Sequence, residues 1–287
     1  MLSASPQFDA GLKARAANAL LALVEAARLA GEIAMRDFRI GAQTCATVEF
    51  KHGGSPVTSA DLAVDRFLKS RLSAKIPDAG WLSEETADDS ARLALSTLIV
   101  VDPIDGTRAF VSGDPRWTVS IALVADHRAV AGVVHAPALD ETFAAAIGSG
   151  ATLNGAPIAA STRRELAGAK IAGPRPLIAR LGDASSVQLL SEPKIPSLAY
   201  RLARVASGSL DGAFAAADSH DWDIAAADVL LSESGACLTD AKGLPLSYNR
   251  AATRRGALAA APSALLPSLI STLSLAFAGA TAGNLTA

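Results

Sequence analysis

Residues 98–107 read Leu-Ile-Val-Val-Asp-Pro-Ile-Asp-Gly-Thr, an apolar run followed by two acids, a glycine and a threonine. The apolar run predicts a buried strand that carries Asp102 and Asp105 to its C-terminal end. Pro103 between them restricts the backbone and favours an extended conformation at Asp102. The final glycine and threonine are expected to open a helix. Hard oxygen ligands would then lie beside the free N–H groups of a helix start, an arrangement that can hold divalent cations and a phosphate together.

The composition is that of a globular protein with a sizeable core. The chain has 287 residues, of which 50% are hydrophobic and 19% are charged, and its formal net charge is −2. This length allows one large domain or two halves around a shared core. No block of basic residues is present, which argues against a nucleic acid polymer as partner. Cys45 and Cys237 cannot make a disulfide framework, and they favour a reducing, cytoplasmic location.

Two apolar segments near the ends of the chain are too short to cross a membrane, so no membrane partner is expected. Residues 16–24 form an uncharged run that is followed by Glu25 and Arg28 rather than by a signal-peptide cleavage site. Residues 265–277 contain Pro267 and several hydroxyl residues, and they fall below the length of a membrane span. They are predicted to form a terminal helix packed on the body of the protein.

Hydrophobic periodicity predicts an α+β first half, residues 1–150, and an α/β second half, residues 151–287. In the first half, amphipathic patterns predict helices over 9–39 and 61–73. Apolar runs separated by turns indicate a mostly antiparallel sheet with strands at 98–101, 119–124, 130–135 and 143–147. The second half alternates a strand at 171–172 with helices at 198–208 and 223–234.

Residues 101–107, Val-Asp-Pro-Ile-Asp-Gly-Thr, closely resemble the signature of the inositol monophosphatase superfamily. Three further segments match the same superfamily in the expected order: 58–61 (Thr-Ser-Ala-Asp), 81–85 (Trp-Leu-Ser-Glu-Glu) and 221–226 (Asp-Trp-Asp-Ile-Ala-Ala). The resemblance covers most of the chain. A single motif of this kind would be a weak signal, whereas four in order are a strong one.

The resemblance implies a layered α-β-α-β-α sandwich of the inositol monophosphatase and fructose-1,6-bisphosphatase type, with the site between the two halves. Residues 1–150 would carry most of the metal ligands, and residues 151–287 would carry Asp223 and the substrate contacts. The resemblance also implies a homodimer, inhibition by lithium, and a mobile loop at residues 51–55 close to the metals. Periodicity alone does not predict this architecture.

Four carboxylates, those of Glu84, Asp102, Asp105 and Asp223, come together in the superfamily that the chain resembles. Four negative charges at close range require cations or protons, and oxygen-only ligands favour Mg²⁺ over zinc. The resemblance implies that Glu84, Asp102 and the backbone carbonyl of Ile104 bind one Mg²⁺. It assigns a second Mg²⁺ to Asp102, Asp105 and Asp223, and a third, weaker ion to Glu84 through water.

Each acid also has an ordinary structural explanation when it is taken alone. Asp102 before a proline and Asp105 before a glycine are typical of turns. Asp223 could cap the helix that follows it, and Asp61 could stabilise a helix N-terminus. The four motifs together favour the metal site over these separate explanations.

Two Mg²⁺ ions suit hydrolysis of a phosphate monoester by direct attack of metal-activated water, and no motif for a phosphorylated enzyme intermediate is evident. By resemblance, the Thr107 hydroxyl, oriented by Asp61, accepts or relays the proton of the attacking water, and Glu84 is the other candidate base. Backbone N–H groups at the helix start would bind the phosphate. The expected phosphate and substrate contacts are Gly106, Thr107, Asp105 and Asp223.

Four further residues lie close to these motifs or invite a functional assignment. Trp222 is expected to pack behind the metal cluster, and His220 is near enough to the Trp-Asp motif to contact the substrate. Glu85 either orients its neighbour Glu84 or lies in solvent. Arg175 could bind a second phosphate or remain a surface arginine.

The substrate is less clearly specified, because the chain mixes features of several branches of the superfamily. Inositol-specific members carry a glutamate seven residues before the Asp of the Trp-Asp motif, where this chain has Ala216. Asp221 and residues 197–200 look more like bacterial 3'(2'),5'-bisphosphate nucleotidases. Residues 151–155 look like the inositol branch, and residues 105–110 resemble histidinol-phosphate phosphatases.

The favoured substrate is therefore 3'-phosphoadenosine 5'-phosphate, ahead of inositol 1-phosphate and then histidinol phosphate. An alternative of another class is a non-catalytic binding protein that keeps the fold as a scaffold. The presence of every expected metal ligand and of Thr107 favours an enzyme.

Overall fold

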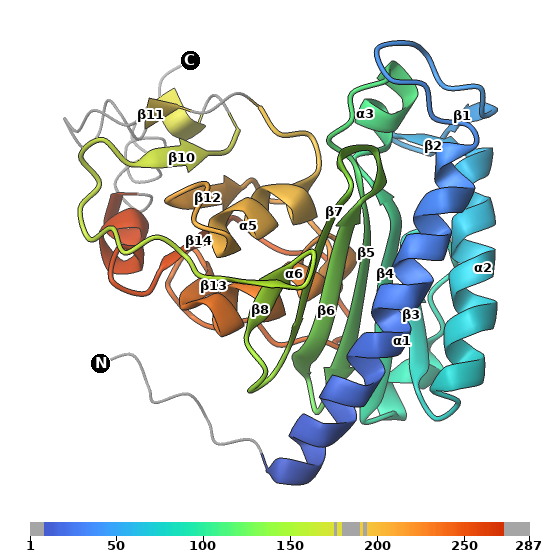
Figure 1. The fold of residues 1–287 in the computed structure, drawn as a ribbon, viewed down its shortest axis with the longest axis horizontal. Coiled ribbons are helices and arrows are strands. Elements are labelled where there is room, and N and C mark those ends of the chain that lie inside the picture. Colours follow the sequence, from blue (N-terminus) through green and yellow to red (C-terminus); the bar gives the residue numbers. More distant parts are fainter. Residues whose placement is uncertain (1–8, 175–176, 180–189, 192–193, 273–287) are drawn as a thin grey trace, which may run out of the picture.

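The structure, a computed structural model, describes residues 9–174, 177–179, 190–191 and 194–272. Helices and sheets alternate in five layers (Figure 1). The named helices are α1 (Ala10–Met35), α2 (Ser59–Lys75), α3 (Thr107–Ser112), α5 (Leu198–Ala206) and α6 (Asp221–Ser234), with short 3₁₀ turns η1 (Ser90–Ala94) and η2 (Pro137–Leu139). Residues 266–272 are also helical. None of the helices in this described part is long and apolar enough to cross a membrane.

The larger sheet has seven strands in chain order: β3 (Gly80–Ser83), β4 (Thr97–Asp105), β5 (Thr118–Ala125), β6 (Arg128–Ala136), β7 (Glu141–Ala146), β8 (Ala151–Leu153) and β9 (Ala156–Ile158). Strands β3 and β4 are parallel, and every later pair is antiparallel. The mostly antiparallel first sheet is therefore confirmed. Because β8 and β9 belong to this sheet, it continues past residue 150.

The smaller sheet has the strand order β11-β10-β12-β14-β13, with β10 (Lys170–Ala172), β11 (Leu190–Ser191), β12 (Gly212–Ala215), β13 (Ala236–Asp240) and β14 (Leu258–Pro262). A separate hairpin pairs β1 (Val48–Phe50) with β2 (Pro56–Thr58). Strand β10 is parallel to its neighbours β11 and β12, whereas β14 is antiparallel to β12 and β13. This mixed sheet agrees with the change of pattern that the sequence shows in its second half.

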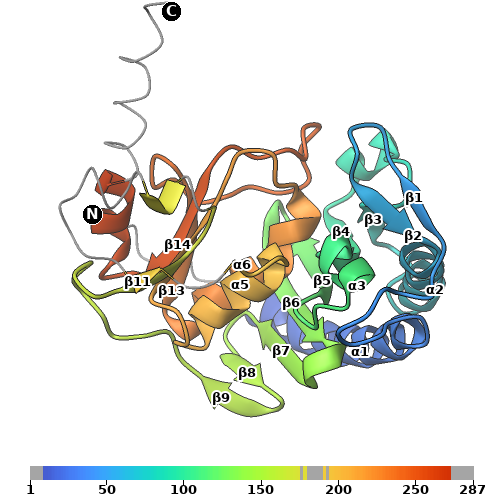
Figure 2. The same ribbon diagram turned by 90° about the horizontal axis from the view of Figure 1, so that it is seen from above.

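The alternation of side chains along β4 explains the layering. Ile99 and Val101 pack with α1 and α2, whereas Leu98 and Val100 pack with α5 and α6 on the opposite face. A strand covered on both faces is apolar at every position, as the sequence of β4 is before Asp102. Figure 2 shows α5 and α6 between the two sheets. The layered α-β-α-β-α sandwich is confirmed.

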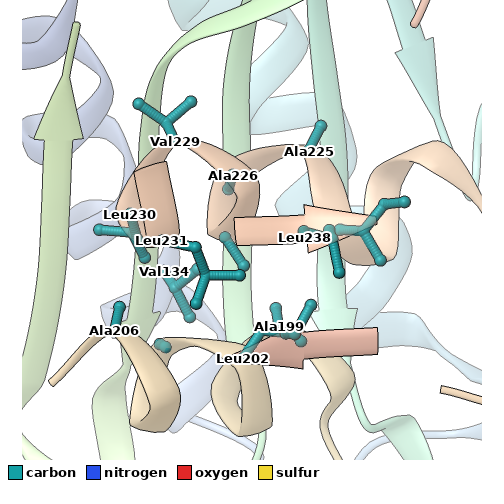
Figure 3. Packing of buried hydrophobic residues seen from close by; sticks show 14 of the residues in the cluster. Val134, Ala199, Leu202, Ala206, Ala225, Ala226, Val229, Leu230, Leu231 and Leu238 are labelled. Carbon is teal, nitrogen blue, oxygen red and sulfur yellow. The ribbon is translucent and has the colours of Figure 1, made fainter. Parts of the chain in front are cut away.

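The middle layer is packed closely against the larger sheet. Figure 3 shows Leu231 of α6 in one cluster with Val134 of β6 and Leu202 of α5. Gly132 of β6 lies directly under α6, where a Cβ atom would come within 2.4 Å of the Ala226 carbonyl oxygen. Only glycine therefore permits this approach of helix and strand. Close packing here fixes α6, which carries Asp223, relative to β4.

Several predicted boundaries are wrong by a few residues. Helix α1 ends at Met35 rather than at residue 39, because the chain then turns to bury Phe38 against Trp117. Helix α6 begins at Asp221, so Asp223 is its third residue and not its cap. Of the predicted terminal helix, residues 266–272 are helical, and residues 273–277 lie outside the described part of the chain.

His135 on β6 makes the stability of the fold depend on pH. The ring is buried against Gly31 of α1, and Nδ1 lies 3.0 Å from the Thr142 hydroxyl oxygen. Burial lowers the pKa of His135 to about 4. The unfolded chain binds this proton near pH 6.5 and the folded protein does not, so stability is fully present above about pH 6.5 and falls as the pH drops towards 4.

We expect wild-type protein to lose roughly 2–3 kcal/mol more stability than His135→Asn between about pH 7.5 and 4.5. Urea unfolding at a series of pH values measures this difference in slope, which does not depend on how stable the variant is at neutral pH. The matched control is His52→Asn, which changes an exposed histidine in the loop at residues 51–55. Parallel curves for wild type and His135→Asn would contradict the expectation.

Candidate active site

Three acidic side chains meet at one edge of the larger sheet. Glu84 follows β3 and Asp102 lies near the end of β4, and because these strands are parallel both acids emerge at the same edge. Asp223 reaches the same place from the first turn of α6. Carboxylate oxygens of Glu84, Asp102 and Asp223 all lie within 4.8 Å of one another. These three residues are called the acidic cluster below.

An irregularity in β4 presents Asp102 and Asp105 at this edge. The register of β4 against β5 shifts between these two residues, where Pro103 has no N–H to donate. The Ile104 N–H turns back to Asp102 Oδ1 at 3.0 Å. The predicted strand thus runs through both acids instead of ending before them, and the bulge provides the local bend.

Asp105 lies beside the acidic cluster and is held from the second half of the chain. Its Oδ2 accepts hydrogen bonds from the Ser197 hydroxyl and the Ala199 N–H, both at 2.6 Å. Ser197 is fully buried and also caps α5 by accepting the Tyr200 N–H. Oδ2 of Asp105 is therefore engaged at the start of α5, and a metal held by Asp105 would bind through Oδ1. Ser197 stands out in the sequence only as part of the segment typical of one branch, and its contact with Asp105 was not predicted.

The start of α6 is fixed on both sides of Asp223. The His220 N–H donates to Asp223 Oδ2 at 2.6 Å, which also satisfies one free donor of the helix N-terminus. Asp221, fully buried, forms an ion pair with Arg255. The Asp221 N–H donates to the Thr253 carbonyl at 3.0 Å. The acid before Trp222 thus serves to anchor the helix.

Burial and mutual repulsion disfavour the ionised forms of these acids. Burial, followed by the nearby charges, raises the pKa of Asp102 and of Asp223 well above the usual value. Burial raises the pKa of Asp105 to about 6, against the hydrogen bond from Ser197 that lowers it. The donor set consists of oxygens alone, and divalent cations such as Mg²⁺ would compensate the charges. The residues present therefore fit Mg²⁺.

Lys51 is a site residue that the sequence analysis missed. Its ammonium lies 2.8 Å from Glu84 Oε1 and 2.7 Å from Glu85 Oε1. The Glu85 side chain is only 4% exposed, so the alternative that Glu85 lies in solvent is wrong. Burial raises the pKa of Glu85 to about 7, while Lys51 opposes this shift. The signal available in the sequence was a single lysine opening the loop at residues 51–55.

Thr107 and Asp61, which the resemblance pairs, lie close together. Thr107 Oγ1 lies 3.0 Å from the Ile104 carbonyl oxygen and 3.4 Å from Asp61 Oδ1. Asp61 Oδ2 accepts from the Thr58 N–H and the Thr58 hydroxyl, so this carboxylate is fixed at the start of α2. Burial raises the pKa of Asp61 to about 6. The helix-stabilising role and the contact with Thr107 therefore coexist in one side chain.

Gly106 has the left-handed conformation, φ 91°, that glycine tolerates best, and it opens α3. A Cβ atom at Gly106 would lie 3.3 Å from the Ser197 backbone nitrogen, so the two halves of the chain approach closely here.

His220 and Trp222 stack with ring centroids 4.5 Å apart, and His220 Nδ1 lies 3.1 Å from Thr253 Oγ1. Arg175 lies outside the described residues.

Comparison with known proteins agrees with this geometry. The family model described as "Inositol monophosphatase family" matches residues 16–276. The 3'(2'),5'-bisphosphate nucleotidase CysQ of Aggregatibacter actinomycetemcomitans is 32% identical over 240 residues, 79% of this chain and 86% of that protein. Inositol monophosphatase 3 of Solanum lycopersicum is 34% identical over 231 residues, 77% of this chain and 85% of that protein.

Solved structures share the fold over nearly the whole chain. The extragenic suppressor protein suhB of Bartonella henselae superposes with a TM-score of 0.78 at 29% identity, covering 89% of this chain and 98% of that one. The Thermotoga maritima IMPase gives a TM-score of 0.80 at 25% identity, covering 91% and 99%.

The layered fold and the matching relatives define the class of protein as a phosphatase, a hydrolase of phosphoric monoesters. The chain belongs to the inositol monophosphatase family. This family is in general Mg²⁺-dependent and acts on small phosphorylated substrates. The predicted family and reaction class are confirmed.

Proposed function

We propose that this protein is a Mg²⁺-dependent phosphomonoesterase whose preferred substrate is 3'-phosphoadenosine 5'-phosphate, with inositol 1-phosphate as the second candidate. The observation that carries the proposal is the acidic cluster beside the Thr107–Asp61 pair at one edge of the sheet. A non-catalytic scaffold would have no need for four carboxylates held at this edge against their own repulsion.

The ligand assignment is the one that the family resemblance implies, and the acidic cluster is compatible with it. Glu84, Asp102 and the Ile104 carbonyl would hold one Mg²⁺, and Asp102, Asp105 and Asp223 would hold a second. A third, weaker ion would bind near Glu84. When bound, Mg²⁺ supplies Lewis-acid activation of the phosphoryl group and of water near neutral pH.

The remaining steps belong to the side chains and backbone of α2 and α3. In our proposal, the Thr107 hydroxyl relays a proton: it accepts one from the attacking water while its own hydroxyl proton passes to Asp61 Oδ1, the carboxylate oxygen that orients it. Glu84 is the alternative base. The backbone N–H groups of Gly106 and Thr107 would bind the phosphate at the start of α3, since the first amides of a helix have no partner within it. Asp105 and Asp223 would complete the substrate contacts.

The preference for the nucleotide rests on Ala216, where inositol-specific members carry a glutamate, and on Asp221. The similarity to the CysQ nucleotidase of Aggregatibacter actinomycetemcomitans supports it. The comparable identity to Inositol monophosphatase 3 of Solanum lycopersicum keeps inositol 1-phosphate as the second candidate. Histidinol phosphate is third, on the resemblance of residues 105–110.

Phosphate release from the three substrates in parallel, with and without Mg²⁺, tests the proposal. We expect kcat/KM for 3'-phosphoadenosine 5'-phosphate to exceed the others by about a hundredfold, which corresponds to about 2.7 kcal/mol of transition-state discrimination. A preference of this size for inositol 1-phosphate would reverse the ranking, and similar weak rates would indicate a broad phosphatase. No Mg²⁺-dependent rate on any substrate would favour a non-catalytic scaffold.

A homodimer and a cytoplasmic location are further proposals, made on family resemblance and on the two unpaired cysteines. Light scattering on the purified chain tests the first of these, and a monomeric mass would contradict it. The division into halves at residues 1–150 and 151–287 is also a proposal.

A further inference from the structure

Helix α2 presents two acids one turn apart, and the proposed function uses only the first. Asp61 faces Thr107, whereas Asp65 follows four residues later and therefore lies on the same side of the helix. Asp65 is 5% exposed. No ion pair within the described part of the chain includes it, so hydroxyl groups alone meet its charge.

Both oxygens of Asp65 hold the segment that carries Glu84 and Glu85. The Ser83 hydroxyl donates to Asp65 Oδ1, and the Thr86 hydroxyl donates to Asp65 Oδ2 at 2.6 Å. The Ser83 oxygen in turn accepts the Glu85 N–H at 3.3 Å. Because Ser83 has one hydroxyl proton and gives it to Asp65, this chain of hydrogen bonds has a fixed direction.

The two hydroxyl residues flank the two glutamates, so Asp65 fixes the segment at both ends. Glu84 belongs to the acidic cluster, where repulsion from Asp102 and Asp223 opposes its position and the Lys51 ammonium, 2.8 Å from Glu84 Oε1, offsets part of that repulsion. The backbone bond from the Glu84 N–H to the Val101 carbonyl, at 3.2 Å, holds one point of the loop. Asp65 supplies the contacts from the opposite side, on a helix packed into the core.

We propose that Asp65 is a positioning residue that fixes Glu84 in its metal-binding orientation through Ser83 and Thr86. The inference rests on the proposed function, because it assigns Asp65 to a Mg²⁺ site. Helix α2 would then set the position of both ligand loops, that of Asp102 through Asp61 and Thr107, and that of Glu84 through Asp65. Loss of such an outer partner typically weakens metal binding by about 10- to 100-fold.

Two substitutions at Asp65 separate the effect of its hydrogen bonds to Ser83 and Thr86 from the effect of its negative charge. In Asp65→Asn the amide oxygen can still accept from Ser83, and the amide N–H can donate to the Thr86 hydroxyl after that hydroxyl rotates. Asp65→Ala removes both contacts. We expect Asp65→Ala to raise the Mg²⁺ dissociation constant about tenfold or more and Asp65→Asn to remain within about threefold of wild type. Lys69→Ala, an exposed position one turn further along α2, is the matched control.

Calorimetric titration of the full chain with Mg²⁺ alone, in the absence of substrate, gives the dissociation constants, and urea unfolding gives stability. A double-mutant cycle identifies the route of the effect. In a Glu84→Gln background, Asp65→Ala should weaken Mg²⁺ binding little further, because Asp65 acts through Glu84. If Asp65→Ala does not fold, Thr86→Val and Ser83→Ala, which each remove one contact, replace it in the cycle.

Wild-type Mg²⁺ affinity in folded Asp65→Ala, or in both single-contact variants, would overturn the inference and leave the proposed function standing. The same holds if the loss persists undiminished in the Glu84→Gln background, since the effect would then be a general loss of structure. If wild-type protein neither binds Mg²⁺ nor releases phosphate, the proposed function fails and the inference fails with it.

Discussion

Asp105→Asn is expected to lower kcat for Mg²⁺-dependent phosphate release by about a thousandfold, or about 4 kcal/mol. The structure gives a specific reason for so large an effect from a nearly isosteric change. Asp105 Oδ2 accepts from the Ser197 hydroxyl and the Ala199 N–H. An asparagine must place its only acceptor oxygen there, so its NH₂ group, which cannot bind a cation, faces the position where a ligand oxygen is required.

Steady-state kinetics over a range of Mg²⁺ concentrations measures this effect, with urea unfolding as a check on folding. Burial raises the pKa of Asp105 to about 6, so removal of its charge should not destabilise the metal-free protein strongly. The matched control is Asp78→Asn, which neutralises an exposed acid outside the four motifs. Full hydrolysis by Asp105→Asn would show that the two-metal proposal is wrong.

Thr107→Val is expected to reduce kcat by about 10²- to 10³-fold while leaving KM and Mg²⁺ affinity nearly unchanged. Valine matches the shape of threonine but lacks the hydroxyl that lies 3.4 Å from Asp61 Oδ1 and 3.0 Å from the Ile104 carbonyl oxygen. An effect confined to kcat indicates a group that acts in the transition state and not in ground-state binding.

Thr107→Ser keeps the hydroxyl and should retain activity within about tenfold of wild type. If Asp61 acts through Thr107, Asp61→Asn should add little to the defect of Thr107→Val, since residues that act as a unit are not additive. A Thr107→Val enzyme with wild-type kcat would instead assign the base to Glu84. Equal losses in Thr107→Val and Thr107→Ser would indicate a packing role for this side chain.

The motifs and the family resemblance pointed to acids that the structure brings together, since carboxylate oxygens of Glu84, Asp102 and Asp223 lie within 4.8 Å of one another. The spacing of Asp102 and Asp105 around Pro103 put both acids at the end of a buried strand, and their resemblance to the superfamily joined them to Glu84 and Asp223. The contacts that hold these acids could not be found in this way. Lys51 and Glu84 are 33 residues apart, and Ser197 and Asp105 are 92 apart, so neither pair belongs to one local pattern.

Local sequence also misplaced the ends of elements by a few residues, for reasons that lie elsewhere in the fold. Helix α1 stops at Met35 because Phe38 is buried against Trp117, a residue that follows β4 in the sequence. The start of α6 at Asp221 depends on the buried ion pair of Asp221 with Arg255. Helical periodicity has no information about either partner.

The sequence by itself determined the family, the reaction class and the order of the acidic motifs, because apolar alternation and short motifs are properties of neighbouring residues. Only the tertiary structure decided how each carboxylate is held: Asp105 by Ser197 just before α5, Glu84 through the loop that Asp65 contacts, and Asp223 by the His220 N–H at the start of α6. A hydrogen bond depends on distances of about 3 Å between atoms. Those distances are set by the packing of layers that are far apart in the chain.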